Sequence, residues 1–155
     1  MPVMTPFVLL RQNEQPTLTI RARTRVQDLP GLIGQSYARI AAYLGELGEI
    51  VSDVPFVCYY NLDMQDLDVE IGFPVSGNLP DKDDIKSSGI PAGFTVFCMY
   101  RGPYSDMAPA YGDMGKWIEE NGFAPAGPAY EFYYNGPDCA PDELLTKIVL
   151  PVIRK

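Results

Sequence analysis

Glu131 is the one carboxylate in an aromatic run, Tyr130-Glu131-Phe132-Tyr133-Tyr134. Side chains of a β-strand alternate between its two faces, so Tyr130, Phe132 and Tyr134 should share one face. Glu131 and Tyr133 should then share the other. In this position the acid is either solvated or lines a pocket, and the sequence leaves both readings open.

A carboxylate among rings has a defined chemistry if its face lines a pocket. It would pair with an organic cation, and each ring would add about 0.5–2 kcal/mol of cation–π attraction. Because removing an ammonium group from water is costly, such a site favours delocalised, lipophilic cations over compact polyamines. The ten Tyr, seven Phe and one Trp are enough to line such a pocket. For any single ring, ordinary packing is the competing interpretation.

Other catalytic chemistries are excluded or disfavoured by composition. The chain has no histidine, so it cannot form imidazole-based triads, Cys-His pairs or histidine metal sites. Cys58, Cys98 and Cys139 have no Cys-x-x-Cys spacing, which disfavours a structural zinc site. The glycine pairs at 31/34 and 112/115 lack the context of a phosphate-binding loop. We therefore expect no metal and no cofactor.

Charge and hydropathy restrict the partners and the compartment. The net charge is −8 without a basic cluster, which argues against direct binding of nucleic acid and favours cationic partners. No apolar run approaches the roughly 18 residues needed to cross a bilayer, and no signal sequence is apparent at the N-terminus. An odd number of dispersed cysteines fits a reducing compartment. We expect a soluble, cytoplasmic protein that does not bind membranes.

The two halves of the chain resemble each other. Val69–Val75 matches Thr146–Val152 at an offset of 77 residues, and the segment from Pro55 matches the segment from Pro128 with about one inserted residue. We expect residues 1–155 to form one domain, with repeats at about 7–75 and 91–153 and a surface linker at about 76–90. Each repeat reads strand, helix, strand, strand. The expected fold is α+β, a pseudo-symmetric antiparallel sheet of duplicated β-α-β-β units with two helices and a central ligand cleft.

Both helices are predicted from apolar spacing and start signals. The first is expected to begin at Asp28 as N-cap, with Pro30 in its first turn. The second is expected to begin near Ser105, although Pro109 would then cost a hydrogen bond. Their apolar faces follow spacings of three and four residues and comprise Ile33, Tyr37, Ile40, Leu44 and Leu47 in the first helix and Met107, Tyr111, Met114 and Ile118 in the second.

Short motifs recur in a fixed order along the chain. In the second half they are Gly102-Pro103-Tyr104, Trp117-Ile118, Gly127-Pro128-x-x-Glu131-x-Tyr133 and Thr146-x-Ile148-x-x-Pro151-Val152. In the first half they are Asp28-Leu29-Pro30, Tyr43-Leu44, Pro55-Phe56-x-x-Tyr59-Tyr60 and Asp68-Val69-Glu70-x-Gly72-x-Pro74-Val75. With these motifs the chain resembles the GyrI-like small-molecule-binding domain, which is also the effector-binding domain of bacterial multidrug-responsive transcription activators.

The resemblance implies roles for particular residues. Glu131 corresponds to the family's central acid, which receives cationic drugs among stacked aromatic rings. By position, the wall of the ligand cleft would include Tyr133, Tyr104, Trp117, Phe56 and Tyr59. The implied function is the sensing or sequestration of lipophilic, often cationic aromatic molecules.

Two alternatives follow from the same resemblance. Some stand-alone relatives hydrolyse cyclopropane-containing alkylating compounds, and here Glu131 would be the base, with Tyr133 or Tyr104 as proton donor. Other relatives inhibit DNA gyrase by binding it. No helix-turn-helix or winged segment precedes residue 16, so we do not expect the chain as given to be a complete transcription activator. A DNA-binding protein or gyrase is a candidate partner. Lys147 departs from the family pattern, which commonly has an acid there, and could alter the charge of the cleft.

Overall fold

The computed structural model describes residues 3–155, and its contacts divide the chain into two compact units. The central unit is Glu14–Pro91. The terminal unit is Ala92–Lys155 together with the N-terminal residues as far as Asn13. Among the described residues each unit has one α-helix and antiparallel strands, which confirms the predicted α+β class.

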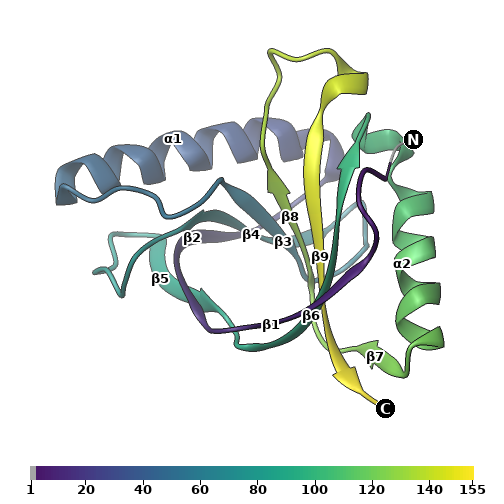
Figure 1. Ribbon diagram of the computed structural model, residues 1–155. Helices are drawn as coiled ribbons and strands as arrows, with labels where there is room; N and C mark the ends of the chain where they lie inside the picture. The colour runs from purple at the N-terminus through teal and green to yellow at the C-terminus, as the bar shows by residue number, and fades with distance from the viewer. Residues whose placement is uncertain (1–2) are drawn as a thin grey trace. The chain divides into compact units, whose positions relative to one another are not determined.

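The central unit packs one helix on a four-stranded sheet. Its elements are β2 (Gln15–Thr24), η1 (Val26–Asp28), α1 (Leu29–Leu47), β3 (Phe56–Tyr59), β4 (Leu67–Pro74) and β5 (Ile85–Ile90), with strand order β3-β4-β2-β5. Figure 1 shows α1 lying along β2 and β4. The buried core beneath α1 comprises Leu18, Ile20, Ile40, Tyr43, Leu44, Val75 and Ile85.

Helix α1 starts where its sequence predicts, with one correction. Asp28 occupies the N-cap position, but its side chain makes no capping hydrogen bond. Its carboxylate pairs instead with Arg25, at 3.1 Å between Nη2 and Oδ2. Pro30 lies in the first turn, where its missing N–H costs no hydrogen bond. Gly48 ends the helix with φ of 68°, a left-handed conformation that glycine adopts without strain.

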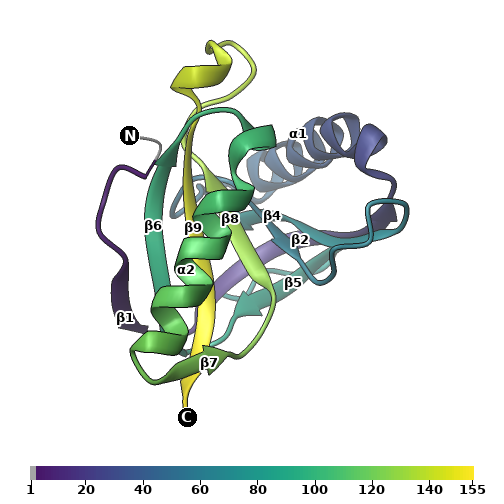
Figure 2. The same ribbon diagram turned by 90° about the vertical axis from the view of Figure 1, so that its right-hand side faces the viewer.

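The terminal unit also packs one helix on a sheet. Its elements are β1 (Val8–Gln12), β6 (Gly93–Arg101), η2 (Tyr104–Asp106), α2 (Ala108–Glu120), β7 (Phe123–Pro125), β8 (Ala129–Tyr133), η3 (Pro141–Glu143) and β9 (Leu145–Arg154). The strand order is β1-β6-β9-β8, with β7 also paired to β9. Figure 2 shows α2 lying across β6, β9 and β8.

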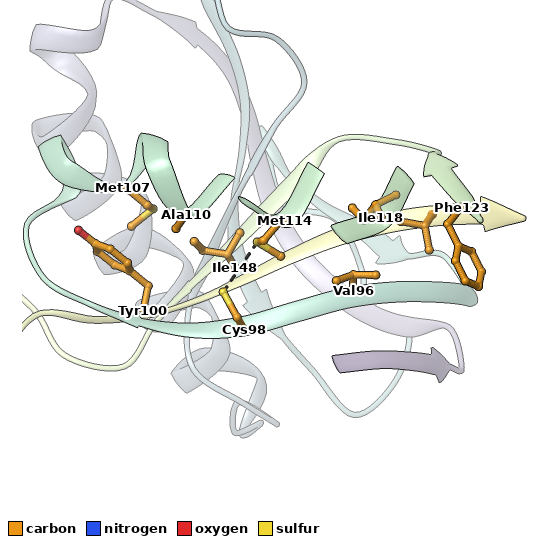
Figure 3. Packing of buried hydrophobic residues seen from close by; sticks show 10 residues of the cluster. Val96, Cys98, Tyr100, Met107, Ala110, Met114, Ile118, Phe123 and Ile148 are labelled. Carbon is orange, nitrogen blue, oxygen red and sulfur yellow. Dashed lines mark hydrogen bonds between the residues drawn. The ribbon is translucent and has the colours of Figure 1, made fainter. Parts of the chain in front are cut away.

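The core of the terminal unit fills the space between α2 and the sheet. Figure 3 shows Met114 of α2 above Cys98 of β6 and Ile148 of β9, all fully buried. Helix α2 begins at Ala108, three residues later than predicted. Pro109 therefore lies in the first turn, and the hydrogen bond that an earlier start would have cost is not lost.

The duplication predicted from the 77-residue offset is confirmed by the strand order. The sequence β2, α1, β3, β4 in the central unit has the same order and pairing as β6, α2, β8, β9 in the terminal unit. Strands β1, β5 and β7 were not predicted from the sequence. Residues 85–90, assigned to the linker, form β5, and Ile85 and Ile90 at its ends are buried.

The strand registers identify equivalent positions in the two units. Val57 pairs with Ile71 in the central unit, as Glu131 pairs with Ile148 in the terminal unit. The place that Glu131 occupies in one unit is thus held by an apolar residue, Val57, in the other.

Candidate functional site

Strand β8 turns Glu131 towards helix α2. Glu131 pairs with Ile148 and Tyr133 pairs with Thr146, and directly paired residues lie on the same face of a sheet. Ile148 belongs to the core beneath α2, so Glu131 and Tyr133 lie on the helix side. Tyr130 is on the other side and buried, as the predicted alternation requires. Phe132 is also buried, whereas Tyr134, just after the strand, is exposed.

Two tyrosine hydroxyls bind the carboxylate of Glu131. Tyr133 Oη donates to Oε1 at 2.9 Å, within the same strand. Tyr111 Oη donates to Oε2 from helix α2. Because helix and strand both supply a donor, the half-buried side chain of Glu131 is fixed between them. Both tyrosines contact the acid through their hydroxyl groups, whereas the resemblance implied an aromatic wall for Tyr133.

The ionisation of Glu131 reflects two opposing effects. Burial raises the pKa of the carboxyl group above its ordinary value, because removal from water penalises the charged form. The hydrogen bonds from Tyr111 and Tyr133 lower the pKa, since they stabilise the carboxylate. Burial prevails, so the net pKa shift is upward. A cation placed beside this carboxylate would lower its pKa, because a nearby positive charge stabilises the charged form.

Tyr104 lies beside this pair on the short helix η2. Its ring meets the ring of Tyr133 edge-on, with centroids 5.6 Å apart and planes at 68°. Burial, followed by the nearby charge of Glu131, raises the pKa of the Tyr104 hydroxyl. The residue is nevertheless 49% exposed. Tyr104 therefore borders the Glu131 cluster on a side that solvent reaches.

Three predicted site residues lie elsewhere in their units. Trp117 is half-buried on α2 and packs against the core cluster of the terminal unit. Phe56 and Tyr59 belong to β3 of the central unit, where Phe56 is buried and Tyr59 is half-buried. Three positions apart on a strand, these two side chains point to opposite faces. The roles of all three in ligand binding stay predictions.

Tyr111 was not among the predicted site residues. Its helical spacing with Met107 and Met114 assigned it to the apolar face of the helix, where it does lie. The feature of the sequence that could have identified Tyr111 is its hydroxyl group. A tyrosine on a helix face that packs on a sheet needs a hydrogen-bond partner. Glu131 is that partner, but only the tertiary structure brings the two together.

Lys147 lies on the far side of the sheet from Glu131. It pairs with Met99 and Phe132, one residue out of phase with the face that carries Ile148. Its Nζ is 4.5 Å from the ring centroid of Phe97 and 5.9 Å from that of Phe132. Within the terminal unit its positive charge is thus directed away from the helix-facing side where Glu131 lies.

Two further findings hold for the described part of the chain. Within residues 3–155 no group of three or more His, Cys, Asp or Glu side chains could hold a metal ion. No helix there combines the length and apolarity required for a membrane span.

Comparison with known proteins gives one family and a set of similar folds. The model of the GyrI-like small molecule binding domain matches residues 5–153. No curated protein sequence matches the chain. The crystal structure of the EcmrR C-terminal domain is similar over the whole of both chains, with a TM-score of 0.85 and 22% identity.

Three further structures share the fold at low sequence identity. EcmrR in a DNA complex has a TM-score of 0.83 and 22% identity over 97% of this chain, which spans only 58% of that one. A hydrolase from Listeria innocua has a TM-score of 0.72 and 15% identity, covering 97% of this chain and 94% of that one. SAV2435 bound to tetraphenylphosphonium has a TM-score of 0.64 and 13% identity, covering 96% and 94%.

Proposed function

The chain belongs to the GyrI-like small-molecule-binding domain family, and from this premise we propose that it binds lipophilic, cationic aromatic molecules with Glu131 as their counter-ion. The function would be the sensing or sequestration of such compounds. The observation that carries the proposal is the state of Glu131, a carboxylate turned inwards and held by Tyr111 and Tyr133 while burial raises its pKa.

The physical argument concerns the cost of the buried negative charge. The hydroxyl groups of the two tyrosines replace only part of the hydration that the Glu131 carboxylate loses on burial, because the net shift of its pKa is upward. Each carboxylate oxygen keeps a lone pair beyond the one that accepts a phenol. A cation that enters without a tightly held hydration shell gains the attraction of the carboxylate and loses little by leaving water.

The neighbouring rings favour a lipophilic cation that carries aromatic groups. Tyr104 and Tyr133 present aromatic surface beside the acid, and Tyr104 is accessible from solvent. SAV2435, which shares the fold, is bound to tetraphenylphosphonium, a lipophilic cation without a hydrogen-bonding group. Tetraphenylphosphonium is therefore a suitable first probe for this chain.

Substitution of Glu131 by Gln tests the proposal. The change keeps the size of the side chain and removes its charge. Binding of tetraphenylphosphonium, followed by calorimetry or by the fluorescence of the single Trp117, should weaken roughly tenfold or more, as expected when an interaction with a charged group is lost. Binding of the neutral triphenylphosphine oxide should change little.

Glu120→Gln is the matched control. Glu120 is exposed on α2 of the same unit, so its substitution removes one charge without touching Glu131. This variant should bind both probes as the wild type does. Equal losses for the cationic and neutral probes in Glu131→Gln would reject Glu131 as the counter-ion.

Hydrolysis of a strained alkylating compound is the second candidate. It is favoured by the raised pKa of Glu131, because a general base works best with a pKa near the operating pH. Glu131 would deprotonate a water molecule, and Tyr133 or Tyr104 would protonate the leaving group. Product formation from a cyclopropane-containing electrophile, abolished in Glu131→Gln, would establish this activity. A gyrase or DNA-binding partner stays a prediction from the resemblance alone.

A further inference from the structure

We propose that Thr146 is a specificity-determining residue of the Glu131 site, whose hydroxyl binds a hydroxyl or amino group carried by the cationic ligand. The inference rests on the proposed function, since it requires that a cation binds at Glu131. Thr146 would provide a second point of contact for the ligand. It would select among cations by their hydroxyl or amino group rather than by their charge.

The first observation is that the Thr146 hydroxyl is buried without a partner. The residue is 0% exposed, and its Oγ1 has no hydrogen bond within residues 3–155. Two other buried threonines have hydrogen-bond partners: Thr19 donates to Glu70 at 2.6 Å, and Thr95 donates to the carbonyl of Leu10 at 3.4 Å. A buried hydroxyl without a partner is unfavourable, and an absent ligand or water is a common explanation.

The second observation is the position of Thr146 on the sheet. It lies in β9, directly paired with Tyr133 on one side and with Tyr100 on the other. Directly paired side chains have Cβ atoms about 4.5–5.5 Å apart. Thr146 therefore adjoins Tyr133, the residue whose hydroxyl binds Glu131, and lies on the same helix-facing side of the sheet.

The third observation comes from the duplicated unit. The residue equivalent to Thr146 is Val69, which pairs with Tyr59 as Thr146 pairs with Tyr133. Val69 is also 0% exposed, so this position packs well without a hydroxyl. Val57 replaces Glu131 in the same unit. The hydroxyl and the acid thus occur together in the terminal unit and are both absent from the equivalent positions of the central unit.

The chemistry of the two groups defines the ligand class. Ionised Glu131 only accepts hydrogen bonds, whereas a threonine hydroxyl both donates and accepts one. A cation that also carries a hydroxyl or amino group can bind both. Thr146 lies diagonally opposite Glu131 on the neighbouring strand, since Glu131 pairs with Ile148, two residues further along β9. Tetraphenylphosphonium lacks such a group and therefore cannot form a hydrogen bond with Thr146.

The test compares Thr146→Val with wild type on four ligands. These are tetraphenylphosphonium and its three derivatives with one hydroxyl in the ortho, meta or para position of one ring. At least one hydroxylated isomer should lose roughly three- to tenfold in affinity in Thr146→Val, the effect of one neutral hydrogen bond. Tetraphenylphosphonium should bind both proteins equally, and Thr146→Ser should bind the isomer as the wild type does.

Thr95→Val is the matched control, because it removes a buried threonine hydroxyl from β6 on the opposite face of the sheet. It should change the relative affinities of the four ligands no more than twofold. Equal affinity changes for all four ligands in Thr146→Val would overturn the inference while the effect of Glu131→Gln still supports the proposed function. A wild type that binds none of the four would overturn the proposed function and this inference with it.

Discussion

At the residue scale, Glu131 combines a buried charge with donors that only partly compensate for it. Its folded-state pKa is raised, so the folded protein holds a proton there more tightly than the unfolded chain does. The stability that this proton provides is fully present below the ordinary pKa of 4.5 and is lost as the pH rises through the raised value. At neutral pH, ionised Glu131 therefore destabilises the fold relative to a neutral side chain.

The upward pKa shift of Glu131 predicts how the stability of Glu131→Gln relative to the wild type depends on pH. Glu131→Gln should be more stable than the wild type at about pH 7 and close to it at about pH 4, because the carboxyl group is then protonated in both the folded and unfolded states. Urea unfolding of both proteins across this range measures the difference. A difference that grows on acidification would contradict the raised pKa.

Tyr111 should control the ionisation of Glu131 from helix α2. Tyr111→Phe removes a donor that lowers the pKa of Glu131, so the pH below which cation binding is lost should move upwards. A titration of tetraphenylphosphonium affinity against pH checks this. Tyr43→Phe is the control, because Tyr43 donates to the carbonyl of Pro80 in the central unit. An unshifted pH midpoint in Tyr111→Phe would show that its hydrogen bond does not stabilise the carboxylate.

At the element scale, the spacing of apolar residues and the residues typical of helix starts and turns allowed the helices and most paired strands to be predicted. Alternation along β8 placed Glu131 and Tyr133 on one face, which the ladder with β9 confirms. Strand β1 was missed because it is only five residues long and has no alternation, since adjacent Leu10 and Arg11 are both exposed. Strand β5 was missed because Lys86, Ser87, Ser88 and Gly89 lie between its two buried isoleucines, so its sequence resembles a loop. The bond between Tyr111 and Glu131 links residues 20 positions apart, and no local pattern encodes it.

Alanine substitutions at two glycines distinguish the effect of backbone crowding on stability from the effect of helix propensity. A Cβ on Gly72 of β4 would lie 2.0 Å from the carbonyl oxygen of Leu18 in the neighbouring strand. Gly34 of α1 has no such neighbour within 4 Å. Gly72→Ala should destabilise the protein by about 1–3 kcal/mol or more, as overpacking does. Gly34→Ala should stabilise it by about 0.5–1 kcal/mol through helix propensity. Urea unfolding measures both, and a neutral Gly72→Ala would contradict the crowding.

At the scale of the whole molecule, duplication explains what the sequence could reveal. The 77-residue offset indicated that two units share one order of elements, and the strand order and pairing of the two units agree with it. The same duplication supplies an internal reference, because Val57 and Val69 show what the fold accepts where Glu131 and Thr146 stand. Val57 and Val69 thus show that packing at these two positions requires neither an acid nor a hydroxyl.

The most direct test of Glu131 as counter-ion is the number of protons released when a cation binds. Calorimetric titration with tetraphenylphosphonium, repeated in buffers of different ionisation enthalpy, measures this number at each pH. Because a bound cation lowers the raised pKa of Glu131, the wild type should release up to about one proton at mildly acidic pH, and Glu131→Gln should release none. Equal proton release by the two proteins would contradict the account.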